Sequence, residues 1–180
     1  MGAVEEAAAV TPVALDEVKA YLRLEAGDED ALLVGLIHSA TGLCERFVGR
    51  ALIAREAEEV VPASSAWRRL TVTPVVSVGA VEAIGQDGAG EALAVEHYAI
   101  DIDANGDGWV RVTTPDDFAR VRVTYVAGMG SDWNAVPEAL RQGIVRLTTH
   151  LFTHRDGAED TGPPAAVAAL WRPWRRMRLS

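Results

Sequence analysis

Apolar residues recur every three or four positions in three stretches of the chain, which is the spacing of an amphipathic helix. The first stretch covers residues 15–22 and predicts a helix of about ten residues. The second begins after Asp28, a suitable N-cap, has a broad apolar face from Leu32 onward and ends before Gly49, a suitable C-cap. The third begins at Pro137 and ends before Gly157. A short fourth helix is expected over 165–171.

The middle of the chain follows a different pattern. From about Glu56 to Val126 it is rich in Val, Thr, Ile and Tyr, in short runs separated by turn residues such as those at 86–90 and 103–108. The expected strands are 70–72, 75–81, 98–100, 109–112 and 121–126. The chain therefore predicts an α+β fold, in which a β-rich subdomain is inserted into a helical bundle core.

These patterns divide the chain into four parts. We expect a loose N-terminus over 1–12 and a helical core formed by 13–54 and 134–169. The inserted β-rich subdomain is expected over 55–133, and an extended C-terminal arm over 170–180. Pro173 favours the extended arm, because proline does not continue a helix.

Composition indicates a protein made in a reducing cytoplasm, with no membrane span and no secretion signal. The longest apolar stretches, such as 31–37, fall well short of the ~20 residues that cross a bilayer. The N-terminus is acidic and lacks the basic region of a signal peptide. The single cysteine, Cys44, excludes an intrachain disulfide and lies on an apolar helical face, where it is expected to be a small buried hydrophobe.

Charge is distributed unevenly between the body and the C-terminus. The chain carries −9 and residues 170–180 carry +4 with no acid, so the first 169 residues carry −13. An acidic body repels nucleic acid over most of its surface. The C-terminal segment therefore suggests a partner of its own.

The C-terminal segment combines Trp and Arg, the residue types most enriched in protein–protein hot spots. Two other hypotheses remain: the segment folds back on its own acidic body, or it binds nucleic acid through its arginines. The absence of Lys and the interleaved apolar residues weigh against nucleic acid. The expected partner-binding residues are Trp171, Arg172, Trp174, Arg175, Arg176, Met177, Arg178 and Leu179.

One loop has the spacing of a calcium site. EF-hand positions 1, 3, 5 and 7 are matched by Asp101, Asp103, Asn105 and Asp107. Gly106 fills the sixth position, but Val112 stands where a bidentate Glu belongs. Since the flanks predict strands and Asn-Gly favours tight turns, a hairpin is the main interpretation and a calcium-dependent binding module the alternative.

Other candidate chemistry is weak. His150 and His154 are four residues apart on a predicted helix, but HExxH needs a Glu where Leu151 stands, so a structural role is favoured over zinc. The sequence has no GxSxG motif and no P-loop. We therefore expect no catalytic residue, no metal and no cofactor.

Three stretches carry a resemblance to a known family. They are 15–24 with 28–40, 125–130 with 136–150, and 163–170 ending in Trp174–Leu179. In their order and spacing they resemble the phage head–tail connector (adaptor) family, and most closely the adaptors of gene transfer agents.

The resemblance implies a structural protein in the neck of a phage or gene transfer agent particle. It implies a homo-oligomeric ring, generally of twelve subunits, that joins the portal protein to a stopper or tail-completion protein while DNA passes through the channel. It also implies that the C-terminal arm, from Trp171 onward, docks on the portal. An acidic body suits a channel wall that must not grip DNA.

Overall fold

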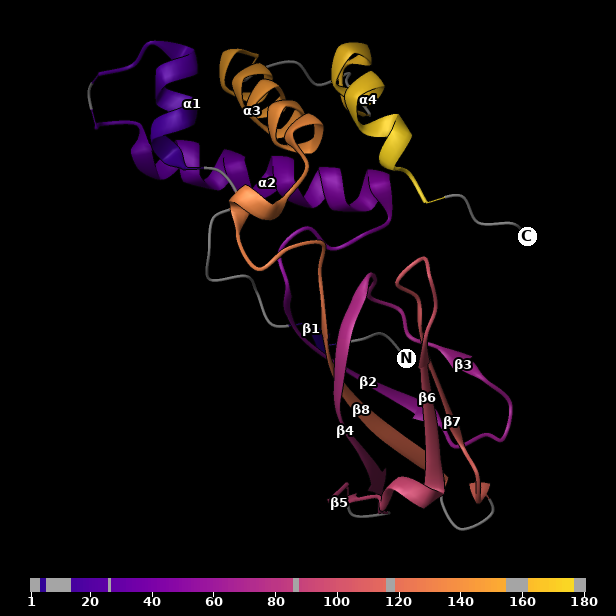
Figure 1. The fold of residues 1–180 in the computed structure, drawn as a ribbon. Coiled ribbons are helices and arrows are strands. Elements are labelled where there is room, and N and C mark those ends of the chain that lie inside the picture. The colour runs from indigo at the N-terminus through magenta and orange to yellow at the C-terminus, as the bar shows by residue number, and fades with distance from the viewer. Residues whose placement is uncertain are drawn as a thin grey trace. The chain divides into compact units, whose positions relative to one another are not determined.

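The computed structural model describes residues 4–5, 14–25, 27–85, 88–115, 119–154 and 162–176. The chain forms two compact units, a β unit of 1–8 and 54–129 and a helical unit of 9–53 and 130–180 (Figure 1). Residues 130–133, which the sequence analysis placed in the β-rich insertion, belong to the helical unit.

The helical unit is built around one long helix. Helices α1, α3 and α4 lie on one side of α2, and α2 makes its most extensive contact with α3 (Figure 1). The bounds are α1 Leu15–Leu22, α2 Asp30–Val48, η3 Trp133–Ala135, α3 Glu138–Thr153, α4 Ala165–Trp171 and η4 Arg172–Trp174, where η marks a 3-10 helix. The predicted helices are thus confirmed.

Of the two caps predicted for α2, the C-cap is confirmed and the N-cap is not. Gly49 adopts φ +71° and its N–H donates to Glu45 O at 2.8 Å, so the predicted C-cap is confirmed. The predicted N-cap is wrong: Asp28 lies in a turn in which Asp30 N–H donates to Gly27 O at 3.1 Å, and α2 begins at Asp30.

Core packing explains the apolar composition of α2. Among the described residues, this helix is long and apolar enough to cross a membrane by length and composition alone. Its fully buried residues are spaced at helical intervals and form the core of the unit: Leu33, Ile37, Ala40, Cys44 and Val48. The sequence analysis also placed Leu32 on the buried face, but Leu32 is 42% exposed.

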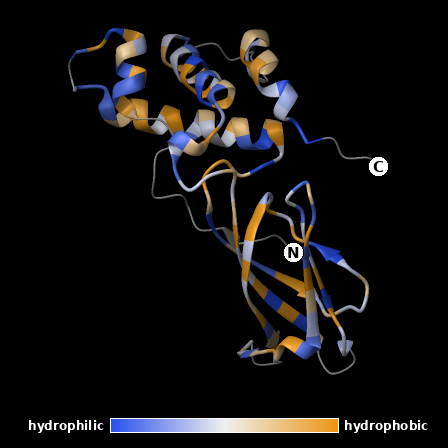
Figure 2. Ribbon diagram, in the orientation of Figure 1, coloured by the Kyte–Doolittle hydropathy of each residue, from blue (hydrophilic) through white to orange (hydrophobic). Residues whose placement is uncertain are grey.

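The β unit contains two antiparallel sheets. The larger has the order β1-β2-β8-β4-β5 and the smaller β3-β7-β6. The bounds are β1 Val4–Glu5, β2 Arg55–Pro62, β3 Arg68–Arg69, β4 Val75–Ile84, β5 Gly90–Ala92, β6 Tyr98–Ile102, β7 Gly108–Val112 and β8 Arg120–Ala127. Hydrophobic and hydrophilic residues alternate along the larger sheet (Figure 2), and the inward residues of β8, from Val121 to Ala127, lie in the core.

Four of the five predicted strands are confirmed, as β4, β6, β7 and β8. The strand predicted over 70–72 is wrong, because the chain bends there after the short strand β3. The predicted loose N-terminus is wrong at Val4–Glu5, which pairs with β2. β2 itself was not among the predicted strands.

Candidate docking site at the C-terminal corner

Trp171, the last residue of α4, is part of the core of the helical unit. Its side chain is 0% exposed, and its ring centroid lies 5.8 Å from that of Phe47. Its Nε1–H donates to Leu140 O at 3.4 Å. The indole occupies the space that Gly143 leaves free, since a Cβ at Gly143 would come within 2.0 Å of Trp171 Nε1. Trp171, which was expected to belong to the extended C-terminal arm and to bind the partner, is therefore buried in the protein's own core.

The residues after Trp171 continue the fold rather than extending from it. Arg172–Trp174 forms the 3-10 helix η4. The Arg175 guanidinium lies 5.8 Å from the Phe47 ring centroid, and Arg176 N–H donates to Val48 O at 2.8 Å. The predicted extended arm is thus wrong as far as Arg176. The hypothesis that the segment folds back on its own body holds to that point, through ring and backbone contacts with the end of α2.

We call residues 172–176 the C-terminal corner. Arg172 and Arg175 are exposed, and Trp174 is half-buried. Neither Arg172 nor Arg175 has an ion-pair partner among the described residues, so both guanidinium groups are available for a carboxylate. The remaining predicted binding residues, Met177, Arg178 and Leu179, lie outside the described residues.

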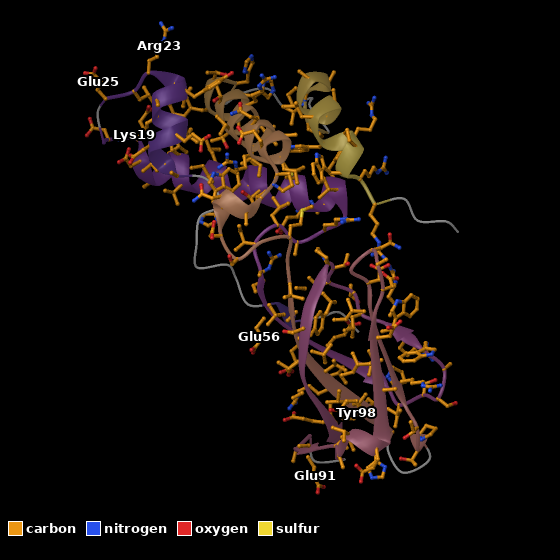
Figure 3. The ribbon with its side chains drawn as sticks, in the orientation of Figure 1. Lys19, Arg23, Glu25, Glu56, Glu91 and Tyr98 are labelled. Atoms are coloured by element: carbon orange, nitrogen blue, oxygen red, sulfur yellow. The ribbon has the colours of Figure 1, made fainter. Side chains whose placement is uncertain are left out.

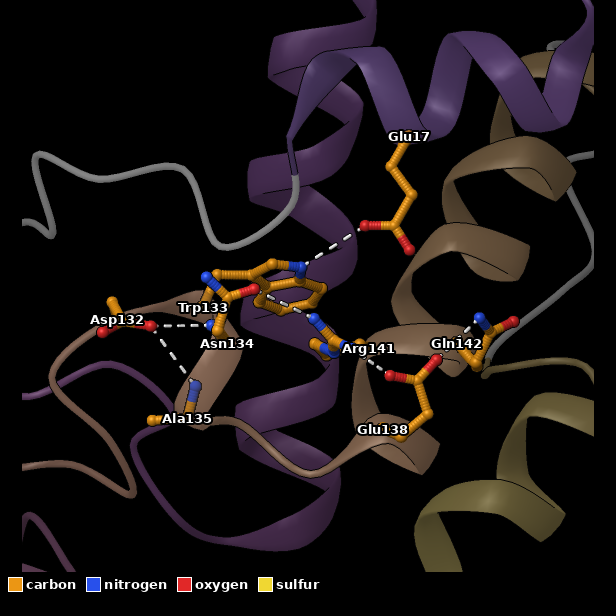
Figure 4. A network of polar contacts seen from close by, with 8 residues as sticks. All are labelled: Glu17, Asp132, Trp133, Asn134, Ala135, Glu138, Arg141 and Gln142. Carbon is orange, nitrogen blue, oxygen red and sulfur yellow. Dashed lines mark hydrogen bonds and ion pairs between the residues drawn. The ribbon is translucent and has the colours of Figure 1, made fainter.

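A polar network at the start of α3 fixes how that helix begins (Figure 4). Asp132 Oδ1 accepts hydrogen bonds from the N–H groups of Asn134 and Ala135, at 2.8 and 3.3 Å, and so caps η3. Trp133 Nε1–H donates to Glu17 Oε2 at 3.4 Å, which joins η3 to α1. The sequence analysis missed this network, although Ser-Asp before Trp-Asn is a cap signal.

Arg141 links this network to the first turn of α3. Its guanidinium lies 5.5 Å from the Trp133 ring centroid and also hydrogen bonds to the carboxylate of Glu138. The hydrogen bond from Arg141, assisted by that from Gln142, lowers the pKa of Glu138. The indole thus packs between α1 and α3, which fixes α3 and with it the groove that receives Trp171.

The predicted hairpin at 101–108 is confirmed, because β6 and β7 pair from Tyr98–Val112 to Ile102–Gly108. Asp103 Oδ1 accepts from the N–H groups of Asn105 and Asp107, at 2.8 and 3.0 Å, and Oδ2 accepts from Trp109 Nε1–H at 3.3 Å. These bonds, the one from Asp107 first, lower the pKa of Asp103. Both oxygens of the central candidate ligand therefore hold the turn.

The second candidate ligand is also engaged by protein groups. Asp107 is buried, accepts from Thr73 Oγ1–H at 3.0 Å and lies 3.7 Å from Arg69 Nη1. No group of three or more His, Cys, Asp or Glu side chains suited to a metal ion exists in the part of the chain that the structure describes. The arrangement of Asp101, Asp103, Asn105 and Asp107 is that of a turn.

The remaining candidate groups show no reactive geometry. His150 and His154 stack with ring centroids 4.4 Å apart at the end of α3. Cys44 is fully buried, as predicted, and burial raises the pKa of its thiol well above the ordinary range, which makes the reactive thiolate inaccessible.

The family model that matches this chain describes head completion proteins, and three similar solved structures are of gene transfer agent particles. Residues 13–162 match the family model described as "Head completion protein". A search of curated proteins finds no match. Among solved structures, a chain in the "Neck of empty GTA particle computed with C6 symmetry" is similar with a TM-score of 0.82 and 24% identity, over 100% of this chain and 98% of that one.

Two further structures match over the same shares of the chains at 25% identity. They are the "Virion of native gene transfer agent (GTA) particle", with a TM-score of 0.79, and the "Neck of native GTA particle computed with C12 symmetry", with a TM-score of 0.77. The similarity thus extends over both units and includes the C-terminal corner. Since the family model covers most of the sequence, the chain belongs to the head completion protein family.

Proposed function

We propose that this protein is a subunit of a head–tail connector ring in the neck of a gene transfer agent or phage particle. The observation that carries the proposal is its similarity over the full chain to proteins in two gene transfer agent neck structures and one gene transfer agent virion structure. A head completion protein is a structural component rather than an enzyme. The C12 symmetry of one matched neck supports a ring of twelve subunits.

We further propose that the C-terminal corner and the residues after it dock on the portal protein. Arg175 offers a guanidinium group without an ion-pair partner among the described residues, and Trp174 adds a half-buried indole, a combination typical of interface hot spots. Arg176, Met177, Arg178 and Leu179 would continue this contact. Trp171 has a different role: buried beneath the corner, it anchors the contact residues instead of touching the partner.

The acidic body suits the rest of the proposed role. The first 169 residues carry −13, so a ring of such subunits repels DNA phosphates and lets DNA pass without specific binding. A surface away from the corner would contact the stopper or tail-completion protein. Around a ring, twelve modest corner contacts combine into a strong attachment by avidity.

Co-sedimentation with the portal tests the docking contact. Truncation after Trp174 keeps Trp171 in the core and removes 175–180, so we expect a folded protein that no longer sediments with the portal. The substitution Arg175→Glu should weaken binding strongly, because like charges across an interface cost several kcal/mol. Arg146→Glu is the matched control, since Arg146 is an exposed arginine of α3 and is not part of the corner. Portal binding that survives the truncation would rule out residues 175–180 as the docking contact.

A further inference from the structure

The helical unit has opposite charges at the two ends of α2. At the start of α2, Glu25 and Asp28 are exposed and have no ion-pair partner among the described residues. Glu29 and Asp30 lie beside them, and Lys19 is bound to Asp30 at 2.9 Å. We call the loop that contains Glu25 and Asp28 the acidic end.

Apolar exposure is also concentrated at the acidic end. Tyr21 is 53% exposed and Leu32 is 42% exposed, and they are the large apolar side chains that the described part of the helical unit leaves exposed. Tyr21 lies in the last turn of α1 and Leu32 in the first turns of α2, on either side of the acidic loop. Figure 3 shows Arg23 and Glu25 projecting from this end of the unit. Arg23 is also exposed, but the acids outnumber the bases.

The basic end is formed by Arg46 and Arg172. Arg46 lies in the last turn of α2 and Arg172 in η4, and both are exposed without an ion-pair partner among the described residues. The packing of Phe47 on Trp171 holds α4 and η4 against the end of α2, so the two arginines share this end. α2 has 19 residues and is therefore about 28 Å long, which separates the two ends.

The helix dipole accounts for only part of this arrangement. Acids in the first turn and bases in the last turn of a helix each stabilise it by about 0.3–1 kcal/mol. That explains Asp30 and Arg46, which belong to α2. It also accounts for Arg172, which is the C-cap of α4. It does not explain why Tyr21 and Leu32 stay exposed beside the acids.

We propose that the acidic end of one copy binds the basic end of the next copy, head to tail. Tyr21 and Leu32 become buried in this contact while Glu25 and Asp28 meet Arg46 and Arg172. A head-to-tail contact uses two different surfaces of each subunit, so it repeats and closes into a ring when the rotation allows. The inference rests on the proposed ring function and assigns its subunit contact.

Disulfide cross-linking tests the contact without removing a charge. Ala31 lies at the acidic end and Ala169 at the basic end, and both are exposed alanines. In the double variant Ala31→Cys/Ala169→Cys, the two cysteines of one chain are too far apart to bond, because a disulfide needs Cα atoms within about 7 Å. The native Cys44 is buried and serves in the wild-type chain as the unreactive control.

On mild oxidation of the free protein, the double variant should give a ladder of covalent oligomers that ends at the closed ring. A mixture of the two single variants should give a heterodimer that neither variant forms alone. If oxidation stops at a dimer with two disulfides, the two ends pair reciprocally in an antiparallel dimer, and the head-to-tail contact is wrong. Absence of cross-linked species at all protein concentrations would overturn the proposal. Neither outcome bears on co-sedimentation with the portal, which tests the ring function separately.

Charge reversal provides a second measurement. Glu25→Arg/Asp28→Arg gives a chain with two basic ends, and Arg46→Glu/Arg172→Glu gives one with two acidic ends. Each alone should self-associate at least about tenfold more weakly than wild type, as measured by sedimentation velocity. Mixed together, the two variants should associate again by alternating around the ring. Failure of the mixture to recover, with both variants folded, would reject charge pairing between the ends.

Discussion

The closest packing in the helical unit gives a sharp stability prediction for Gly143→Ala. A Cβ at Gly143 would lie 2.0 Å from Trp171 Nε1, 2.7 Å from Cε2 and 2.8 Å from Cδ1. The atoms in the way belong to a rigid indole that is fully buried. The ring therefore has to move, and its hydrogen bond to Leu140 O is disturbed. Gly42→Ala in α2 is the matched control, because no atom lies within 4 Å of the added Cβ.

Two outcomes bound the cost. If the indole shifts but stays docked, overpacking costs about 1–3 kcal/mol and the hydrogen bond about 1 kcal/mol. If α4 undocks, the burial of a Trp side chain, about 150–250 Å² at ~25 cal/mol per Å², is lost, or about 4–6 kcal/mol. In either case the higher helix propensity of Ala stabilises the folded protein by about 1 kcal/mol, which offsets part of this cost. The net destabilisation is therefore about 1–5 kcal/mol.

The same propensity term makes the control informative. Gly42→Ala should stabilise the protein by about 1 kcal/mol, so the two variants should differ by at least about 2 kcal/mol. Urea unfolding followed by far-UV circular dichroism measures this difference. Equal stability of the two variants would show that Trp171 does not occupy the groove over Gly143.

Three further predictions concern the β unit. Tyr125→Phe should lower the free energy of unfolding, measured in urea, by about 1–3 kcal/mol, because the Tyr125 hydroxyl donates to buried Glu59 and accepts from Val72 N–H, both at 3.2 Å. Tyr21→Phe, at an exposed position, is the near-neutral control. Equal losses of stability in the two variants would contradict a role for these hydrogen bonds. The pKa of Asp103 in the folded protein lies below its unfolded value of about 3.9. The stability that its ionised carboxylate contributes is therefore fully present above that value and is lost as the pH falls through the folded pKa. Asp103→Asn should accordingly lower Tm at pH 7 and converge with wild type in acid, whereas a constant difference at all pH values would contradict the assignment. Calcium at millimolar concentration should leave Tm unchanged, since the Asp103 oxygens hold the turn, and a rise in Tm would revive the calcium hypothesis.

Sequence periodicity predicted the helices and four strands because their buried faces are built from contiguous, regularly spaced apolar residues. It failed at β2, whose sequence contains a buried acid, Glu59, where an apolar residue is expected. The carboxylate of Glu59 accepts hydrogen bonds from Thr71 and from Tyr125, 66 residues away. Only the folded chain supplies such distant partners, so the pattern of β2 alone does not mark it as a strand.

The C-terminal corner was predicted in composition but not in structure. The arginines around Trp171 and Trp174 suggested that both indoles belong to an extended arm and bind a partner, yet Trp171 is buried and Trp174 half-buried. A signal was present on the partner helix: Gly143 interrupts a run of good helix formers, which usually marks a close approach by another group. The identity of that group depends on tertiary packing, so the sequence indicates a close approach at Gly143 but not that the Trp171 indole makes it.

The buried indole changes the energetics expected for docking. A flexible arm loses conformational freedom on binding, at about 0.5–1.5 kcal/mol for each immobilised long side chain. Here Arg175 and the backbone of Arg176 already contact Phe47 and Val48, so this part of the ordering cost is met when the helical unit folds. Removing the anchor should therefore weaken the proposed portal contact even though Trp171 never touches the portal. Trp171→Ala would then lose portal binding together with helical-unit stability, whereas Arg175→Glu would lose binding at a stability cost of only about 0.5–1 kcal/mol, the size of an exposed cation–π contact.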